Sequence, residues 1–293
     1  MNELHGLFVA AVTPFDEGGA FQGEWQAAHF RWFEEQGIDG VLVGGTNGEG
    51  PSLSADERRA VIDRAVQHRG SVQLVAGTGT PSLQETIALS RYALDQGVDA
   101  VLVIPPYYFR DAPETGLIRY YRSLCDALDG RMLFYHIPRV SGVSITRGLI
   151  EHVRASHPQQ CHGIKDTGGD PGQTAEVVGA FGDWCVLGGS DHLMLANLQA
   201  GVRGQISGLA NAFPELFVRL LRAFRSGGGA EPIQDQIVKL QAILKRYPHH
   251  AALKAIVADR IDLPHSFVKP PLIDLTDEQR AALLREIEAF NSD

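Results

Sequence analysis

The chain has 293 residues, of which 44% are hydrophobic, and it carries a formal net charge of −9. This length suits one large α/β barrel or two ordinary domains, and the apolar content is typical of a globular protein with a sizeable core. An acidic chain without a run of Lys or Arg is a poor partner for nucleic acid or an anionic membrane, so we expect it to bind neither.

The cysteines and the N-terminal residues indicate in which cellular compartment the protein works. Cys125, Cys161 and Cys185 are widely spaced and form no CxxC pair, which argues against a disulfide framework or a zinc site and favours a reduced, intracellular protein. The first apolar stretch stops at Pro14 and follows no basic leader, so it is too short for a signal or membrane-spanning segment. We therefore expect a soluble, cytoplasmic protein.

Short apolar runs alternate with longer amphipathic segments along the chain. Runs that are apolar on both faces suit a parallel sheet covered by helices. Eight such repeats favour a (β/α)8 barrel. The alternative, an open doubly wound sheet, lacks its usual GxGxxG signature. The expected strands lie within residues 7–15, 39–45, 72–79, 99–106, 131–138, 161–167, 184–191 and 204–211.

Capping signals mark two of the intervening helices. Residues 54–68 begin with Ser54 as a cap before an acidic first turn. Residues 82–97 begin with a capping box formed by Ser82 and Glu85, and they end at a glycine.

The last quarter of the chain reads as an extension of the barrel. A helix over residues 213–226 stops at a triple glycine, and residues 230–293 look helical with several proline breaks. We predict a barrel over residues 1–227 and C-terminal helices over residues 228–293. The latter are too few for a core of their own, so both parts should form one structural unit.

In such barrels the C-terminal ends of the strands carry the chemistry. Lys165, the first of only five lysines in the chain, lies at the end of the sixth expected strand. Because side chains alternate along a strand, an inward Lys165 would have Tyr135 as its neighbour on the inner face. The glycine-rich turn at residues 44–50 suits a small carboxylate. An amine, a phenol and an anion-binding turn together predict attack on a carbonyl carbon.

A metal site is the competing interpretation of these strand ends. His136, His162 and His192 lie near them, but the first two should face away from Lys165 by strand alternation. We therefore expect no metal and no external cofactor.

A set of motifs spans almost the whole chain in a fixed order, namely VAAVTPF, GTNGE, VAGTG, PPYY, YHIP, GIKDT and VKPPLIDLT. In these motifs the chain resembles the dihydrodipicolinate synthase and N-acetylneuraminate lyase family of pyruvate-dependent class I aldolases. The resemblance implies a (β/α)8 barrel with a C-terminal helical extension and a Schiff base between lysine and a 2-oxo acid. It also implies a homotetramer built as a dimer of dimers.

The resemblance also implies roles for particular residues. Lys165 falls on the Schiff-base lysine, Tyr135 on a proton carrier and Thr46 on a proton relay. Tyr108 would complete the site of a neighbouring subunit. The expected substrate-binding residues are Gly45, Thr46, Asn47, Thr167, Gly189, Ser190 and Ile206.

The chain departs from the synthase pattern near the second substrate. Asn47 stands where synthases have a second threonine, and His136 stands where the family usually has asparagine. Val140 occupies the position at which synthases hold the aldehyde's carboxylate with arginine. Arg139 comes one place earlier, so strand alternation should point it the other way. We therefore expect a neutral or hydroxylated aldehyde and low activity with aspartate semialdehyde.

Several functions remain open at this point. The leading one is a Schiff-base lyase or aldolase that joins or separates pyruvate and an aldehyde, with a 2-keto-3-deoxy acid as the bound species. The alternatives are 4-hydroxy-tetrahydrodipicolinate synthase, a 2-keto-3-deoxy sugar acid dehydratase using the same imine, and a non-catalytic binding module. Any of the enzymes would act on a small molecule.

Overall fold

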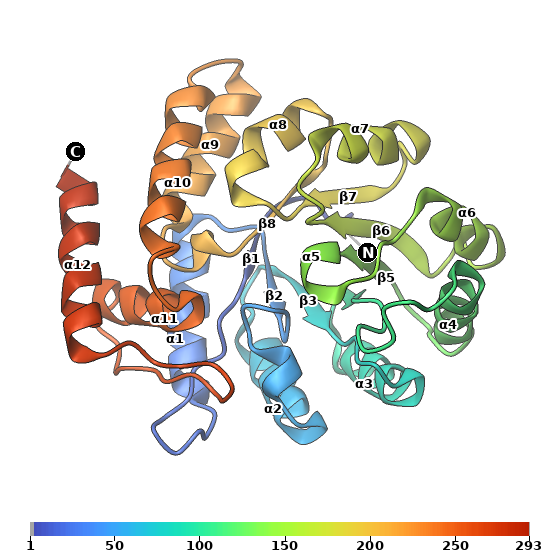
Figure 1. Cartoon of the computed structure of the whole chain (residues 1–293), viewed down its shortest axis with the longest axis horizontal. Coiled ribbons are helices and arrows are strands. Elements are labelled where there is room, and N and C mark those ends of the chain that lie inside the picture. Colours follow the sequence, from blue (N-terminus) through green and yellow to red (C-terminus); the bar gives the residue numbers. More distant parts are fainter. Residues whose placement is uncertain (1–2, 293) are drawn as a thin grey trace.

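Eight parallel strands close into a barrel in chain order, as the computed structural model of residues 3–292 shows (Figure 1). β8 pairs with β1 and completes the ring. Every expected strand forms, so the predicted (β/α)8 barrel is confirmed. The strands are β1 (Gly6–Ala10), β2 (Gly40–Val43), β3 (Gln73–Gly77), β4 (Ala100–Val103), β5 (Met132–His136), β6 (Cys161–Asp166), β7 (Cys185–Gly188) and β8 (Gly204–Ser207).

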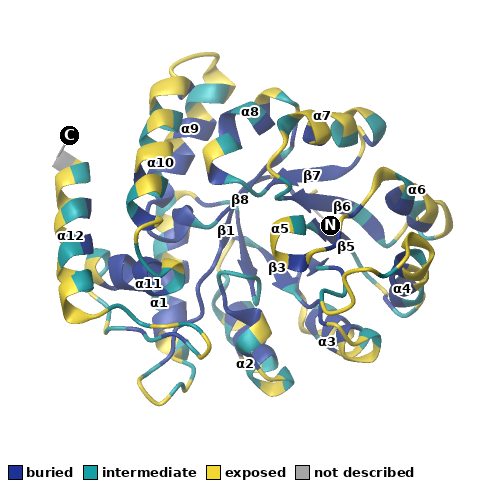
Figure 2. Ribbon diagram, in the orientation of Figure 1, coloured by how far each residue is buried: buried dark blue, intermediate teal, exposed yellow. Residues whose placement is uncertain are grey.

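Helices surround the barrel and bury its outer face. Figure 2 shows the strands in dark blue, buried between the interior and the helices. This two-sided burial explains why the strands read as unbroken apolar runs. The surrounding helices are α1 (Gly23–Gln36), α2 (Ala55–His68), α3 (Leu83–Gln96), α4 (Glu114–Asp126), α6 (Arg147–Ser156), α7 (Pro171–Ala180), α8 (Met194–Gln199) and α9 (Pro214–Ser226).

Four short helical turns follow strand ends, and the sequence patterns did not indicate them. Each turn contains residues that we expected, from the apolar runs, to lie in a strand or in the loop after it. The strands are therefore shorter than expected, and the loops at the C-terminal end of the barrel begin earlier. The turns are η1 (Gly50–Ser52), α5 (Pro138–Ser141), η2 (Asp191–Leu193) and η3 (Leu209–Asn211).

The two predicted helix starts differ in their capping. Ser54 forms a complete capping box with Glu57, each side chain bonding the other's backbone N–H. Ser82 accepts from the Glu85 N–H, but its own N–H donates to Thr80 Oγ1 at 3.1 Å. The predicted Ser82–Glu85 box is therefore wrong in one of its two bonds, because a local turn already satisfies that N–H.

The C-terminal residues form three helices beside the barrel. They are α10 (Ala230–Leu244), α11 (His249–Arg260) and α12 (Asp277–Ser292), and in Figure 1 they gather on the side of α1 and α9. α10 packs on α9 and η2, and α11 contacts η3. These contacts bring the extension to the C-terminal end of the barrel. No helix in residues 3–292 is long and apolar enough to cross a membrane. The division between residues 227 and 228 stays a prediction.

Candidate active site

A cavity of about 590 Å³ opens at the C-terminal end of the barrel. It receives side chains from the ends of the strands and from the C-terminal helices. The residues that the sequence singled out and that line this cavity are Thr46, Asn47, Tyr135, Lys165, Thr167, Gly189, Ser190 and Ile206.

Tyr135 and Lys165 form a cross-strand pair on β5 and β6. Both point into the barrel, and Lys165 is only 5% exposed. Lys165 Nζ donates to the Tyr135 phenol oxygen at 3.3 Å and lies 4.5 Å from the centre of the ring. The phenol can therefore exchange a proton with whatever is attached to Nζ.

A second buried lysine, Lys254 on α11, does not reach the cavity. Its ammonium is fully buried and paired with Glu49 at 2.5 Å. Burial lowers the pKa of Lys254, and the Glu49 carboxylate opposes that shift. Because this amine is occupied and lies outside the cavity, Lys165 is the buried amine placed to attack a ligand.

Gly189 makes room for the groups beside Lys165. A Cβ at this position would lie 2.0 Å from Thr167 Oγ1 and 2.9 Å from Lys165 Cε. Any side chain there would displace both neighbours. Thr167 Oγ1 is buried and has no hydrogen-bond partner within the described residues. This hydroxyl is therefore available to a bound molecule.

The turn at residues 44–50 places Thr46 and Asn47 on the cavity wall. Its glycines serve the compactness of the turn itself, since a Cβ on Gly50 would lie 2.1 Å from the Gly44 carbonyl oxygen. Gly45, expected to bind substrate, lines a separate cavity of about 30 Å³ instead. Thr46 and Tyr135 line both cavities.

Arg139 lines the cavity, contrary to the expectation that it points away. The expectation assumed that strand alternation continues past β5. Residues 138–141 instead form the helical turn α5, so neighbouring side chains are not on opposite faces. Val140 also lines the cavity and is half exposed. Arg139 can therefore supply a cation that Val140 lacks, and a preference for a neutral aldehyde no longer follows from these two residues.

Tyr108 lies away from the cavity of its own chain. It is 77% exposed, and the adjacent Phe109 is 69% exposed. Tyr107 lines the smaller cavity beside Thr46 and Tyr135. Within one chain, therefore, Tyr108 contributes nothing to the site.

His136, His162 and His192 near the strand ends differ in their surroundings. His136 Nδ1 accepts from the Ile145 N–H at 3.1 Å, and His162 bonds the Gln159 carbonyl. Both lie outside the cavity lining, as alternation predicted, whereas His192 lines it. In residues 3–292 no group of three His, Cys, Asp or Glu residues is placed to hold a metal ion.

Part of the wall comes from residues that the sequence patterns missed. Gln241, Lys245 and His249 reach the cavity from the C-terminal helices or the loop between them. Asp191, which the sequence places at the end of the seventh expected strand, also lies in the wall. Burial raises the pKa of its carboxyl, and the Leu209 N–H donates to it at 3.0 Å. The scarcity of lysine in the chain was the one signal that could have drawn attention to Lys245.

The dihydrodipicolinate synthetase family model matches residues 3–290 of the chain. The chain belongs to this family. It is 40% identical to a DapA-like lyase of Chloroflexus aurantiacus, over 97% of this chain and 96% of that protein. It is 33% identical to the 4-hydroxy-tetrahydrodipicolinate synthase of Neisseria meningitidis, over 98% of each.

Solved structures agree with this assignment. The prophage protein YagE of E. coli K12, a member of the dihydrodipicolinic acid synthase family solved in complex with pyruvate, superposes with a TM-score of 0.92. It is 28% identical to this chain, and the match covers 98% of both chains. The family consists of carbon–carbon lyases of the class I aldolase type, and this chain is an enzyme of that kind.

Proposed function

We propose that the protein forms or cleaves a carbon–carbon bond between pyruvate and an aldehyde through an imine on Lys165. The observation that carries this proposal is the Lys165–Tyr135 pair, buried yet facing the cavity. A buried amine beside a phenol matches the needs of imine formation, in which protons move at each step.

The chemistry proceeds on the lysine nitrogen. The neutral Lys165 amine attacks the C2 carbonyl carbon of a 2-oxo acid, and loss of water from the carbinolamine leaves a protonated imine. In the cleavage direction the C4 hydroxyl loses its proton and the C3–C4 bond breaks. The electron pair of the C3–C4 bond forms the C2=C3 double bond while the imine nitrogen accepts the former imine pair. An aldehyde departs and an enamine remains on Lys165. Protonation at C3 and hydrolysis then release pyruvate and restore the amine.

Two groups near Lys165 suit the remaining parts of the 2-oxo acid. The turn bearing Thr46 and Asn47 offers a hydroxyl and an amide for the carboxylate. The partnerless Thr167 hydroxyl suits a substrate oxygen near the reacting carbons. Tyr135 transfers protons while the carbinolamine forms and dehydrates.

The outer cavity wall favours an aldehyde that carries a negative charge. Arg139 and Lys245 both line the cavity, and neither forms an ion pair with a carboxylate of residues 3–292. Both lie near His192, where burial lowers the imidazole pKa; Lys245 and Arg139 lower it further, and the Asp191 carboxylate opposes them. Two unpaired cations in an acidic protein are a suitable site for a carboxylate or phosphate.

This feature supports a second candidate, 4-hydroxy-tetrahydrodipicolinate synthase, because its aldehyde substrate carries a carboxylate. The Neisseria relative has that name. A 2-keto-3-deoxy sugar acid with a second, terminal acid group could place that group against the same two cations. The two candidates differ in the aldehyde and share the imine.

A product screen separates these functions. The protein is mixed with a panel of 2-keto-3-deoxy acids, and separately with pyruvate plus aspartate semialdehyde, and products are identified by mass spectrometry. An aldolase releases an aldehyde and pyruvate in equal amounts. A dehydratase releases water but no aldehyde, and a binding module releases nothing. Absence of turnover across the whole panel would contradict the proposal.

A further inference from the structure

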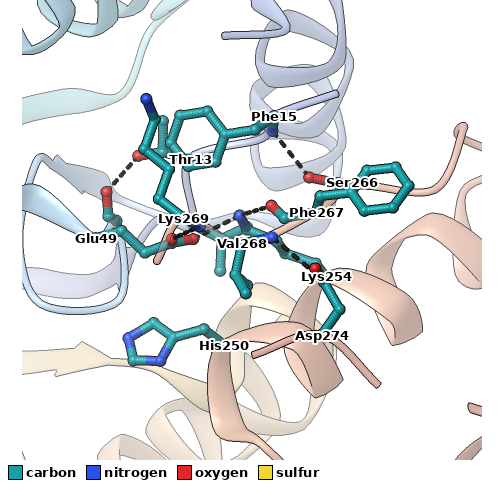
Figure 3. Close-up of polar contacts among 12 residues, drawn as sticks. Thr13, Phe15, Glu49, His250, Lys254, Ser266, Phe267, Val268, Lys269 and Asp274 are labelled. Atoms are coloured by element: carbon teal, nitrogen blue, oxygen red, sulfur yellow. Dashed lines mark hydrogen bonds and ion pairs between the residues drawn. The ribbon is translucent and has the colours of Figure 1, made fainter. Parts of the chain in front are cut away.

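A buried ion pair joins the turn at residues 44–50 to the C-terminal extension. Lys254 Nζ of α11 lies 2.5 Å from Glu49 Oε1, and both side chains are fully buried (Figure 3). Lys254 also donates to the Phe267 carbonyl and lies 4.4 Å from the centre of the Phe15 ring. Burying a charge this completely is costly, so the charge is stable only when its partners are held in place beside it.

The second oxygen of Glu49 is also held. The Lys269 backbone N–H donates to Glu49 Oε2 at 2.8 Å (Figure 3). Glu49 itself has a φ of 56°, a backbone conformation that side-chain-bearing residues rarely adopt. Glycine would suit that conformation better, so the carboxylate accounts for the residue found there.

α11 touches the turn at two further points. His250 Nε2 lies 3.0 Å from the Thr46 carbonyl oxygen, and His249 Nε2 lies 3.3 Å from Asn47 Oδ1. His250 and Lys254 are four residues apart and therefore share one face of the helix. One helix thus contacts the backbone of Thr46, the side chain of Asn47 and the carboxylate of Glu49.

We infer that Glu49 and Lys254 are positioning residues, which hold the turn so that Thr46 and Asn47 present their side chains to the 2-oxo acid. The inference rests on the proposed function, because it assigns the turn to the substrate's carboxylate. It gives the C-terminal helices a part in substrate binding in addition to packing. Other contacts also hold the turn: the Thr13 hydroxyl donates to the Gly48 carbonyl at 2.7 Å, and Arg58 Nε donates to the Gly50 carbonyl at 2.9 Å. Loss of the pair should therefore loosen the turn without unfolding it.

The kinetic test uses Lys254→Met, which removes the charge and keeps most of the stem against Phe15. Its matched control is Arg260→Met on the same helix, because Arg260 pairs with Glu215 of α9 and not with the turn. At a temperature where all variants are folded, Lys254→Met should raise KM for pyruvate about tenfold with little change in kcat, the signature of lost ground-state binding. Arg260→Met should lower the melting temperature and leave KM unchanged.

The double variant Glu49→Gln, Lys254→Met separates positioning from stability. It leaves no unpaired buried charge, so its melting temperature should recover toward wild type while KM for pyruvate stays raised. Recovery of both properties together would overturn the inference, and so would an unchanged KM in Lys254→Met.

Hydrogen exchange tests the same inference without any catalysis. The Glu49 N–H donates to the Thr46 carbonyl and the Gly50 N–H to the Gly45 carbonyl, both inside the turn. Exchange of these amides should accelerate at least about tenfold in Lys254→Met but not in Arg260→Met. Equal exchange in both variants overturns the inference even if the wild-type protein forms no pyruvate adduct. If borohydride traps no pyruvate on Lys165 of the wild-type protein, that result alone would count against the proposed function only.

Discussion

Tyr135 and Lys165 lie opposite each other on β5 and β6, with the phenol oxygen 3.3 Å from Nζ. Within residues 3–292 the phenol is the hydrogen-bond partner of this amine. Neither residue is close to the other in sequence, and the barrel's strand register brings them together. The proposed imine on Lys165 would place the reacting carbon next to Nζ and within reach of the phenol.

Removing the phenol hydroxyl should stop proton transfer and leave the fold intact. Tyr135→Phe should lower kcat by roughly 10² to 10⁴, the usual effect of losing a positioned proton carrier. Tyr121→Phe is the matched control, since its buried phenol donates to the Val103 carbonyl away from the cavity. Steady-state assays and circular dichroism check both variants. Near wild-type turnover in Tyr135→Phe would reduce this residue to a packing role.

A methyl group at residue 189 should disturb the site more than its size suggests. It would collide with Thr167 Oγ1 and Lys165 Cε, and a displacement of about 1 Å at reacting groups can cost about 10² in rate. We expect Gly189→Ala to lose about that much kcat/KM. Gly179→Ala on α7 meets no atom within 4 Å and is the control. Similar kinetics for the two variants would show that the site tolerates the added methyl.

The cations of the outer wall should distinguish acidic from neutral aldehydes. A charged hydrogen bond contributes about 1.5 to 3 kcal/mol, so Arg139→Gln should lower kcat/KM for aspartate semialdehyde about 10- to 100-fold. The effect with glyceraldehyde should be small, and Lys245→Gln should show the same selectivity. Lys239→Gln is the control, because Lys239 is on α10 but does not line the cavity. Equal losses with both aldehydes would refute a charge-specific role.

Tyr108 and Phe109 should be covered by a neighbouring subunit. Two adjacent exposed aromatic side chains are the kind of apolar surface that a neighbouring subunit would cover. We expect light scattering to report an oligomer, with a tetramer as the expected state. Tyr108→Phe should keep that assembly and lose turnover, because its hydroxyl is predicted to serve the neighbour's site. A fully active monomer at assay concentration would contradict this prediction.

The sequence predicted the barrel and the centre of the site because both follow from strand patterns. Apolar runs gave the strands, and the period of two along β5 and β6 placed Tyr135 beside Lys165. The same rule failed for Arg139, because the chain leaves the strand and turns into α5. Proline at the start of that turn was visible, but the helical geometry after it was not.

The contribution of the C-terminal helices could not be predicted from local patterns. Lys245 and His249 reach the cavity only because α10 packs on α9 and η2. Likewise, the Glu49–Lys254 pair joins residues more than 200 positions apart. Such contacts depend on how the extension docks on the barrel, and hydrophobic periodicity carries no information about that docking.

The most direct test of the account is reductive trapping of the imine. The protein is incubated with pyruvate and borohydride, digested, and mapped by mass spectrometry, with Lys165→Ala as the control. We predict irreversible inactivation and a single reduced pyruvyl group on the peptide that contains Lys165. Labelling of another lysine such as Lys245 or Lys254, or no labelling at all, would contradict the Schiff-base mechanism.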